Sequence, residues 1–146
     1  RNRASAKKAG SSFETAVAAY LAEHVDNRIE RRTRNGNKDR GDISGLRGLF
    51  GARIVIECKN SARTDLAGWK REAELEAGND DAIAGLVVSK RHGKSDPADA
   101  WVHMTLADLV ALLTGFRPLT DEDRAGIAED KRFEVTADAA EGGDDL

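Results

Sequence analysis

The chain has 146 residues, of which 40% are hydrophobic and 34% are charged. This length predicts one domain with a single packed core. The sequence contains no apolar run long enough to cross a bilayer and no signal-peptide pattern, so we expect a soluble protein of the cytoplasm, in a bacterium or a phage-infected host cell, with no membrane partner. Cys58 is the single cysteine, which excludes an intramolecular disulfide and any cysteine-cluster metal site.

The formal net charge of −3 is distributed unevenly along the chain. Residues 1–70 hold 15 Lys and Arg against 8 Asp and Glu, whereas residues 101–146 hold 4 against 11. Binding to phosphate groups requires such a local excess of positive charge. The first half of the chain is therefore where we expect contacts with nucleic acid.

The N-terminal segment predicts a basic arm followed by a helix. Residues 1–9 are interpreted as a flexible arm that orders on nucleic acid. Residues 12–24 carry apolar side chains at helical spacing, namely Phe13, Val17, Tyr20 and Leu21. Ser11 and Glu14 match the S-x-x-E capping box, in which the glutamate reaches back to the first backbone amide of the helix. Glu14 could instead point into a cleft and hold a water or a second ion, and the two roles are compatible.

Two short strands and a basic loop are expected next. Residues 28–33 predict a strand whose charged side chains indicate a sheet edge or a DNA-facing surface. Residues 34–40 form a turn-rich basic loop, which is either a solvated hairpin or a grip on the DNA backbone. Residues 42–46 predict the following strand, and residues 48–51 turn the chain back.

Residues 54–60 predict the most informative strand. Side chains alternate across a strand, so Ile56 and Cys58 point to one face and Glu57 and Lys59 to the other. A carboxylate and an amine on the same face, at the end of an apolar strand, indicate that this end opens into a site. The alternative is a surface Glu–Lys pair with Asp42 in an ordinary turn.

The next segment predicts a helix and a buried strand. A helix over residues 64–77 begins at Thr64 or Asp65 as its N-cap, and Trp69 is interpreted as a core anchor. Residues 82–89 are a continuous apolar run, typical of a central strand. Residues 90–94 form a basic cluster for which we favour contact with DNA over a charged exit loop.

The C-terminal part predicts one more strand, one helix and a tail. Residues 101–104 add a strand, and residues 105–115 form an amphipathic helix. Its apolar face is expected to close the core, with a dimer interface as the alternative; the residues of this face are Leu106, Leu109, Val110 and Leu113. Residues 119–146 are acidic and poor in large apolar side chains, so we expect a largely disordered tail.

Asp42, Glu57 and Lys59 together predict phosphodiester chemistry. Hydrolysis of a phosphodiester needs a hard cation that screens the phosphate and lowers the pKa of the attacking water. Mg²⁺ prefers oxygen ligands, which Asp42 and Glu57 would supply. Lys59 would orient or deprotonate the water and offset the charge that develops on phosphorus.

Three motifs carry a resemblance to a known family. Gly10-Ser-Ser-Phe-Glu14, Gly41-Asp42-Ile43 and Ile56-Glu57-Cys58-Lys59 resemble the archaeal-type Holliday junction resolvases and their phage relatives, in the PD-(D/E)xK nuclease superfamily. The match covers roughly residues 7–93. The chain departs from the family at Gly41, where a proline usually precedes the aspartate.

The resemblance implies a fold, a site and an activity. The fold would be α/β and restriction-endonuclease-like, a mixed β-sheet flanked by α-helices, with residues 10–118 as the nuclease domain. The catalytic residues would be Glu14, Asp42, Glu57 and Lys59, with Asp42, Glu57 and Glu14 holding Mg²⁺, for which Mn²⁺ is expected to substitute. The activity would be hydrolysis of DNA by a homodimer that resolves four-way junctions.

Basic and hydroxyl side chains around these motifs are the expected DNA contacts. They are Lys7, Lys8, Ser11, Ser12, Arg34, Lys38, Arg40, Lys70, Lys90 and Arg91. Two other functions remain open at this point. The first is a nuclease of the same superfamily that acts on duplex ends, nicks or flaps in phage replication or packaging. The second is a DNA-binding protein without catalysis, in which Glu57 and Lys59 only pair with each other.

Overall fold

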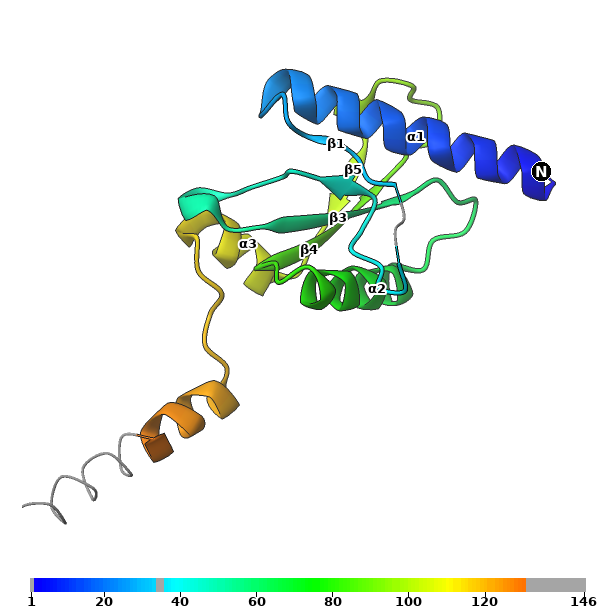
Figure 1. Ribbon diagram of the computed structural model, residues 1–146. Helices are drawn as coiled ribbons and strands as arrows, with labels where there is room; N and C mark the ends of the chain where they lie inside the picture. Colours follow the sequence, from blue (N-terminus) through cyan, green and yellow to red (C-terminus); the bar gives the residue numbers. More distant parts are fainter. Residues whose placement is uncertain (1, 34–35, 131–146) are drawn as a thin grey trace, which may run out of the picture.

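The computed structural model describes residues 2–33 and 36–130. These residues form a five-stranded mixed β-sheet with helices on both faces (Figure 1). The strands lie side by side in chain order, β1 to β5. β3 and β4 are parallel, and the other neighbouring pairs are antiparallel. The predicted α/β class, with a mixed sheet flanked by helices, is therefore confirmed.

The strands are longest at the centre of the sheet. They are β1 (Glu30–Arg31), β2 (Ile43–Ser44), β3 (Ile54–Lys59), β4 (Ala84–Ser89) and β5 (Trp101–His103). All of β4 is buried, as its apolar run predicted. β2 is shorter than the predicted strand at 42–46, because Gly45 has a φ of +84° and takes the chain out of the extended conformation.

Helix α1 (Arg3–His24) begins well before the predicted start at Ser12. Asn2 is the N-cap, and its Oδ1 accepts a hydrogen bond of 2.9 Å from the backbone amide of Ser5. The basic arm expected at residues 1–9 is therefore helical from Arg3 onward. The predicted capping box at Ser11 and Glu14 was wrong, because both residues lie inside the helix. The alanine-rich segment before Ser11 contains no proline, and its single glycine, Gly10, is accommodated inside the helix.

Each face of the sheet is covered by one long helix (Figure 1). On one face, Phe13 and Val17 of α1 pack with Ile56 and Cys58 of β3. On the opposite face, α2 (Leu66–Asn79) buries Trp69 and Ala73 against Val87. The burial of Cys58 and Trp69 confirms that both belong to the core.

Helix α2 lies unusually close to β4. A Cβ atom at Gly85 would come within 2.2 Å of the carbonyl oxygen of Ala73, a distance that no side chain can occupy. Glycine at this strand position therefore lets the helix backbone rest directly on the sheet. The helix begins at Asp65, whose side chain caps the amide of Gly68, as one of the two predicted caps.

Helix α3 (Leu106–Thr114) has the predicted capping box, formed by Thr105 and Asp108, and ends at Gly115 in the left-handed conformation. Two short 3₁₀ turns, η1 (Leu49–Gly51) and η2 (Pro97–Asp99), connect the elements. The prediction that the apolar face of α3 closes the core was wrong. All four of its residues are exposed: Leu106, Leu109, Val110 and Leu113. The helix instead buries Asp108 and Ala111.

Asp108 explains this orientation of α3. Its carboxylate is buried, 2.9 Å from Nζ of Lys70 on α2, and it also accepts a hydrogen bond from Arg117. A buried carboxylate must face its cationic partners, and this requirement turns the leucines outward. The pKa of Asp108 is lowered, because hydrogen bonds from Arg117, the Thr105 amide and Lys70 outweigh the effect of burial.

Part of the predicted tail is helical. Residues 121–130 form a helix that lies away from the sheet, with every residue exposed (Figure 1). Residues 131–146 lie outside the described residues. Within the described ranges, no helix is both long enough and apolar enough to cross a membrane.

Candidate functional site

The C-terminal end of β3 presents two charged side chains to the face that α2 covers. Strand alternation places Glu57 and Lys59 there, while Ile56 and Cys58 pack on the α1 side. Glu57 is only 7% exposed. A carboxylate is rarely buried to this extent unless it is paired or binds a cation.

Asp42 is fixed beside Glu57 by the backbone of β3. Its amide donates a hydrogen bond of 2.9 Å to the carbonyl of Ile56, and its Oδ2 accepts one of 2.7 Å from the amide of Cys58. β2 and β3 are antiparallel, with Ile43 opposite Ile56, so Asp42 comes next to Glu57 in the sheet. The structure thus brings together Asp42 and Glu57, the two carboxylates that were predicted from the sequence to lie in one site.

Gly41 has a structural reason to precede Asp42. Its φ is +89°, and an added Cβ would lie 2.7 Å from Cγ1 of Val55 and 2.9 Å from the carbonyl of Ile56. Proline has a fixed φ near −65° and cannot adopt this conformation. The way the chain enters β2 therefore excludes a proline at this position.

Glu76 is a member of the site that sequence reasoning missed. It lies on α2, is only 4% exposed, and its Oε2 would be 3.6 Å from a Cβ at Gly41. A signal was present in the sequence. Glu76 follows Trp69 and Ala73 at helical spacing, so it occupies the stripe of α2 that packs on the sheet. A glutamate on a buried stripe needs a partner there.

Glu57 and Glu76 form a carboxylate cluster together with Glu72. One ligand oxygen from each of the three residues lies within 4.8 Å of the others. Within the described part of the chain, Oε2 of Glu57 and Oε2 of Glu76 are buried and have no hydrogen-bond donor when both groups are ionised. Two arrangements would satisfy these oxygens, namely a proton shared between the carboxylates or a bound cation.

The pKa values of the site correspond to the first arrangement, in which the carboxylates hold a proton. Burial, followed by the charge of Glu57, raises the pKa of Asp42 to about 7. Burial and a hydrogen bond with Glu57 likewise raise the pKa of Glu76 far above its ordinary value. In the absence of a cation, the site therefore retains protons at a pH where exposed carboxyls have lost them. A divalent cation would displace these protons and offset the repulsion.

Lys59 lies between two of the carboxylates. Its Nζ is 3.2 Å from Oε1 of Glu57 and 2.6 Å from Oε2 of Glu72. Burial alone would lower the pKa of Lys59, but the hydrogen bond to Glu72 and the charge of Glu57 outweigh burial and raise the pKa. Lys59 is therefore an ammonium ion, which can donate hydrogen bonds and offset negative charge but cannot accept a proton.

Glu14 lies at the margin of the site. Its Oε2 is 2.8 Å from Nε of Arg31, and the same guanidinium donates to Oγ of Ser11. The charge of Glu14 nevertheless contributes to the raised pKa of Asp42 and of Cys58, which places it near both. Among the described residues, both Glu14 and Asp42 lie outside the compact cluster of Glu57, Glu72 and Glu76, but Asp42 is fixed beside Glu57 by the backbone of β3.

The donor set fits a hard cation. Asp42, Glu57 and Glu76 offer carboxylate oxygens, the ligands that Mg²⁺ and Mn²⁺ prefer. Cys58 is not a ligand candidate, because it packs into the α1 side of the core and burial raises its thiol pKa. Two orphaned buried oxygens, on Glu57 and Glu76, provide the specific places where an ion would be bound.

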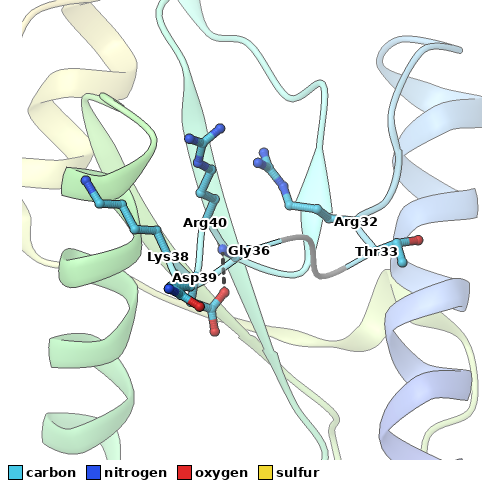
Figure 2. Close-up of a pocket in the computed structure, with 8 residues that line it drawn as sticks. Arg32, Thr33, Gly36, Lys38, Asp39 and Arg40 are labelled. Carbon is cyan, nitrogen blue, oxygen red and sulfur yellow. Dashed lines mark hydrogen bonds between the residues drawn. The ribbon is translucent and has the colours of Figure 1, made fainter.

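The loop before Asp42 carries a group of basic side chains. Figure 2 shows Arg32, Lys38 and Arg40 extending to one side of the loop while the Asp39 carboxylate points to the other. Lys38 and Arg40 are exposed, as phosphate contacts must be. The side-chain amide of Asn79 at the end of α2 donates to the carbonyl of Asp39 (2.8 Å), which anchors the loop near the carboxylates. Arg34 lies outside the described residues.

The other expected DNA contacts flank the same end of β3. Lys7, Lys8 and Ser12 are exposed on α1, and the side-chain amide of Asn60 ties this part of α1 to β3 by donating to the carbonyl of Ala9. The amide of Lys90 donates to the carbonyl of Lys59, so the basic cluster at residues 90–94 begins beside the catalytic lysine candidate.

Lys70 does not belong to this basic surface. Its ammonium group is 2.9 Å from the buried carboxylate of Asp108 and 3.1 Å from Glu74, and its side chain is largely buried. It therefore fixes α3 to α2. We remove Lys70 from the expected DNA contacts.

Comparison of the chain with protein-family models, with curated proteins and with solved structures finds no match.

Proposed function

We propose that the protein is a divalent-cation-dependent endodeoxyribonuclease of the PD-(D/E)xK type, with a restriction-endonuclease-like fold. The observation that carries this proposal is the convergence of Asp42, Glu57 and Lys59 at the end of β3, with two buried carboxylate oxygens that lack a donor in the described structure. A paired surface Glu and Lys would not leave such oxygens.

Asp42, Glu57 and Glu76 are the residues that would hold the ion, with Glu14 as a marginal contributor. The expected ion is Mg²⁺, and Mn²⁺ should substitute, because both accept an all-oxygen donor set. A bound ion would screen the phosphate and lower the pKa of the attacking water.

Lys59 would act as a positioned cation. Its ammonium group is held by Glu57 and Glu72, and its raised pKa keeps it charged. From this position it would donate a hydrogen bond to the attacking water or to a phosphate oxygen and offset the charge that develops on phosphorus. Of the two roles expected from the sequence, orientation is therefore favoured over deprotonation.

The substrate that we propose first is a four-way DNA junction, cut by a homodimer. The resemblance of the three motifs supports this substrate, and two structural features agree with it. Basic side chains lie on both sides of the candidate site, and the exposed apolar face of α3 could be buried between two subunits. A homodimer would bring two sites to the two symmetric strands of a junction.

The test uses labelled four-way junction and linear duplex of matched sequence, each incubated with Mg²⁺, Mn²⁺ or EDTA. Wild-type protein is compared with Glu57→Ala and with Glu122→Ala, an exposed glutamate remote from the sheet. Paired cuts in the junction alone, lost with EDTA and with Glu57→Ala but kept by Glu122→Ala, would establish a resolvase.

Other outcomes separate the alternatives. Cutting of linear duplex, nicked or flapped DNA as readily as the junction would retain the metal site but assign a nuclease of phage replication or packaging. Binding of DNA without cutting under either metal would leave a DNA-binding protein without catalysis.

A further inference from the structure

The sheet register continues the site toward β5. Lys59 of β3 is paired with Ser89 of β4, and Ser89 is paired with Trp101 of β5. Paired residues of neighbouring strands point to the same face, so all three side chains lie on the α2 side. Adjacent strands are about 4.8 Å apart, which puts Trp101 roughly 10 Å across the sheet from Lys59.

A pocket opens on this part of the sheet. Its walls include Trp69, Trp101 and His103, and Ser89 and Lys90 also line it. Two indole rings and an imidazole in one pocket provide flat apolar surfaces. The hydroxyl and amine groups provide hydrogen bonds and charge.

Trp101 is unusually exposed for its size. Half of its surface (51%) is accessible, although it lies on a regular strand, and the guanidinium of Arg91 lies 4.5 Å from its ring centroid. A cation over one part of the ring holds the indole in place and adds positive charge beside it. Such an aromatic–cation pair on a surface is a platform for stacking a nucleobase.

The floor of the pocket offers a fixed polar pair. Oγ of Ser89 and Nε2 of His103 are 2.7 Å apart, and the imidazole lies near Trp69, with 6.3 Å between ring centroids. These contacts hold the imidazole in one orientation. The hydroxyl and the ring can present a donor and an acceptor toward the edge of a base.

We propose that this pocket binds a nucleobase that has left the helical stack, belonging to a nucleotide next to the cleaved phosphate. This inference deepens the proposed function and rests on it for the position of the cut. It names the substrate class as DNA with an unpaired or easily unpaired base beside the cut, as at a branch point or a frayed end.

The first test measures binding without cleavage. In EDTA, the single-stranded oligonucleotide dT12 is titrated against wild-type protein, Trp101→Ala, Trp101→Phe and Val102→Ala. Val102 is the matched control, because it is equally exposed (52%) on the same strand but points to the other face. We expect Trp101→Ala to weaken binding at least about fivefold, Trp101→Phe to retain most of it, and Val102→Ala to bind as wild type.

An abasic oligonucleotide of the same length separates base contacts from phosphate contacts. We expect the abasic strand to bind wild-type protein more weakly than dT12 does. The two strands should bind Trp101→Ala with equal affinity. Equal affinity of the abasic and normal strands for wild-type protein would overturn the proposal, as would unchanged binding by Trp101→Ala.

These outcomes are distinguishable from failure of the nuclease proposal. If Trp101→Ala binds dT12 normally while the wild-type protein cuts DNA, the pocket inference fails and the nuclease stands. If Trp101 supports base-dependent binding but neither metal supports cutting, the base pocket stands as a single-strand binding site and the nuclease proposal fails.

Discussion

Glu57 on β3 and Glu76 on α2 are buried against each other, and each has one carboxylate oxygen for which the described residues supply no donor. Two adjacent buried carboxylates cannot both be ionised without a compensating charge. The pair should therefore bind either a proton or a cation more strongly than an exposed carboxylate would. This relationship makes the proposed metal site testable without any nucleic acid.

Glu76→Gln should distinguish proton binding by this pair from cation binding. The glutamine amide can donate a hydrogen bond to Glu57, so the metal-free variant should be at least as stable as wild type. The same change removes a carboxylate ligand, so the rise in Tm on adding Mn²⁺ should shrink markedly. Thermal unfolding in EDTA and in Mn²⁺ measures both effects.

The control for this change is Glu74→Gln, an exposed position two residues away on the same helix. It should leave the Mn²⁺-dependent rise in Tm unchanged. A full Mn²⁺ effect in Glu76→Gln would remove Glu76 from the set of ligands.

The stability of the metal-free protein should fall as the pH rises from about 4 towards about 7. The pKa of Asp42 is raised to about 7 in the folded state, so the folded protein binds more protons than the unfolded chain in this interval. The free energy of unfolding therefore decreases as pH increases, by a few kcal/mol from Asp42 alone, and the raised pKa of Glu76 adds to the decrease and extends it to higher pH. Urea unfolding in EDTA at several pH values measures the slope.

Two comparisons identify the cause of that slope. Asp42→Asn should reduce it, since the amide does not titrate, and the slope that remains belongs to Glu76, whose pKa is also raised. Saturating Mn²⁺ should reverse it, because the ion binds the ionised carboxylates. The pKa of Asp108 is lowered, so its contribution to stability is lost as the pH falls below about 4, outside this interval.

Gly41→Ala should disrupt the site more than backbone strain alone can explain. Gly36 has nearly the same φ (+87° against +89°), but a Cβ there meets nothing within 4 Å, whereas at Gly41 it meets Val55 and the Ile56 carbonyl. Gly36→Ala should therefore cost about 1 kcal/mol from the left-handed conformation. Gly41→Ala should cost more and weaken Mn²⁺ binding, and equal effects of the two changes would contradict the steric argument.

Lys70→Ala and Lys38→Ala should act on different properties. Lys70 is one of two cations that pair with the buried carboxylate of Asp108, and Arg117 remains when it is removed. Lys70→Ala should therefore lower the free energy of unfolding by about 2 kcal/mol. Lys38 is exposed on the basic loop, so its removal should leave stability unchanged and reduce the dependence of log Kd on log salt by about one. A changed salt slope in folded Lys70→Ala would return Lys70 to the DNA surface.

Local patterns predicted the central elements of the fold well. The alternation of Ile56, Glu57, Cys58 and Lys59 gave the two faces of β3 correctly, and the apolar run gave the buried β4. These predictions succeeded because strand alternation and complete burial leave direct traces in the order of residues. The meeting of Asp42 with Glu57 followed from the antiparallel pairing of neighbouring strands.

The failures involve tertiary partners that lie far apart in sequence. Ser11 and Glu14 match a capping box, but Asn2 begins the helix earlier and Arg31 takes the glutamate side chain. The leucine-rich face of α3 is typical of a helix face that packs on a core. The ion pair of Asp108 with Lys70 instead turns this face toward solvent. Glu76 was overlooked because its partners come from another element.

The absent side chain at Gly85 has a consequence beyond packing. Because the helix backbone rests on β4 there, Glu72 and Glu76 of α2 are within reach of Glu57 of β3, which is remote from them in sequence. The proposed ligands Glu57 and Glu76 therefore lie on segments that meet only when the helix is fully seated. Resistance to protease in the presence of Mn²⁺ would accordingly report how firmly α2 is docked, and Gly85 sets the clearance on which that docking depends.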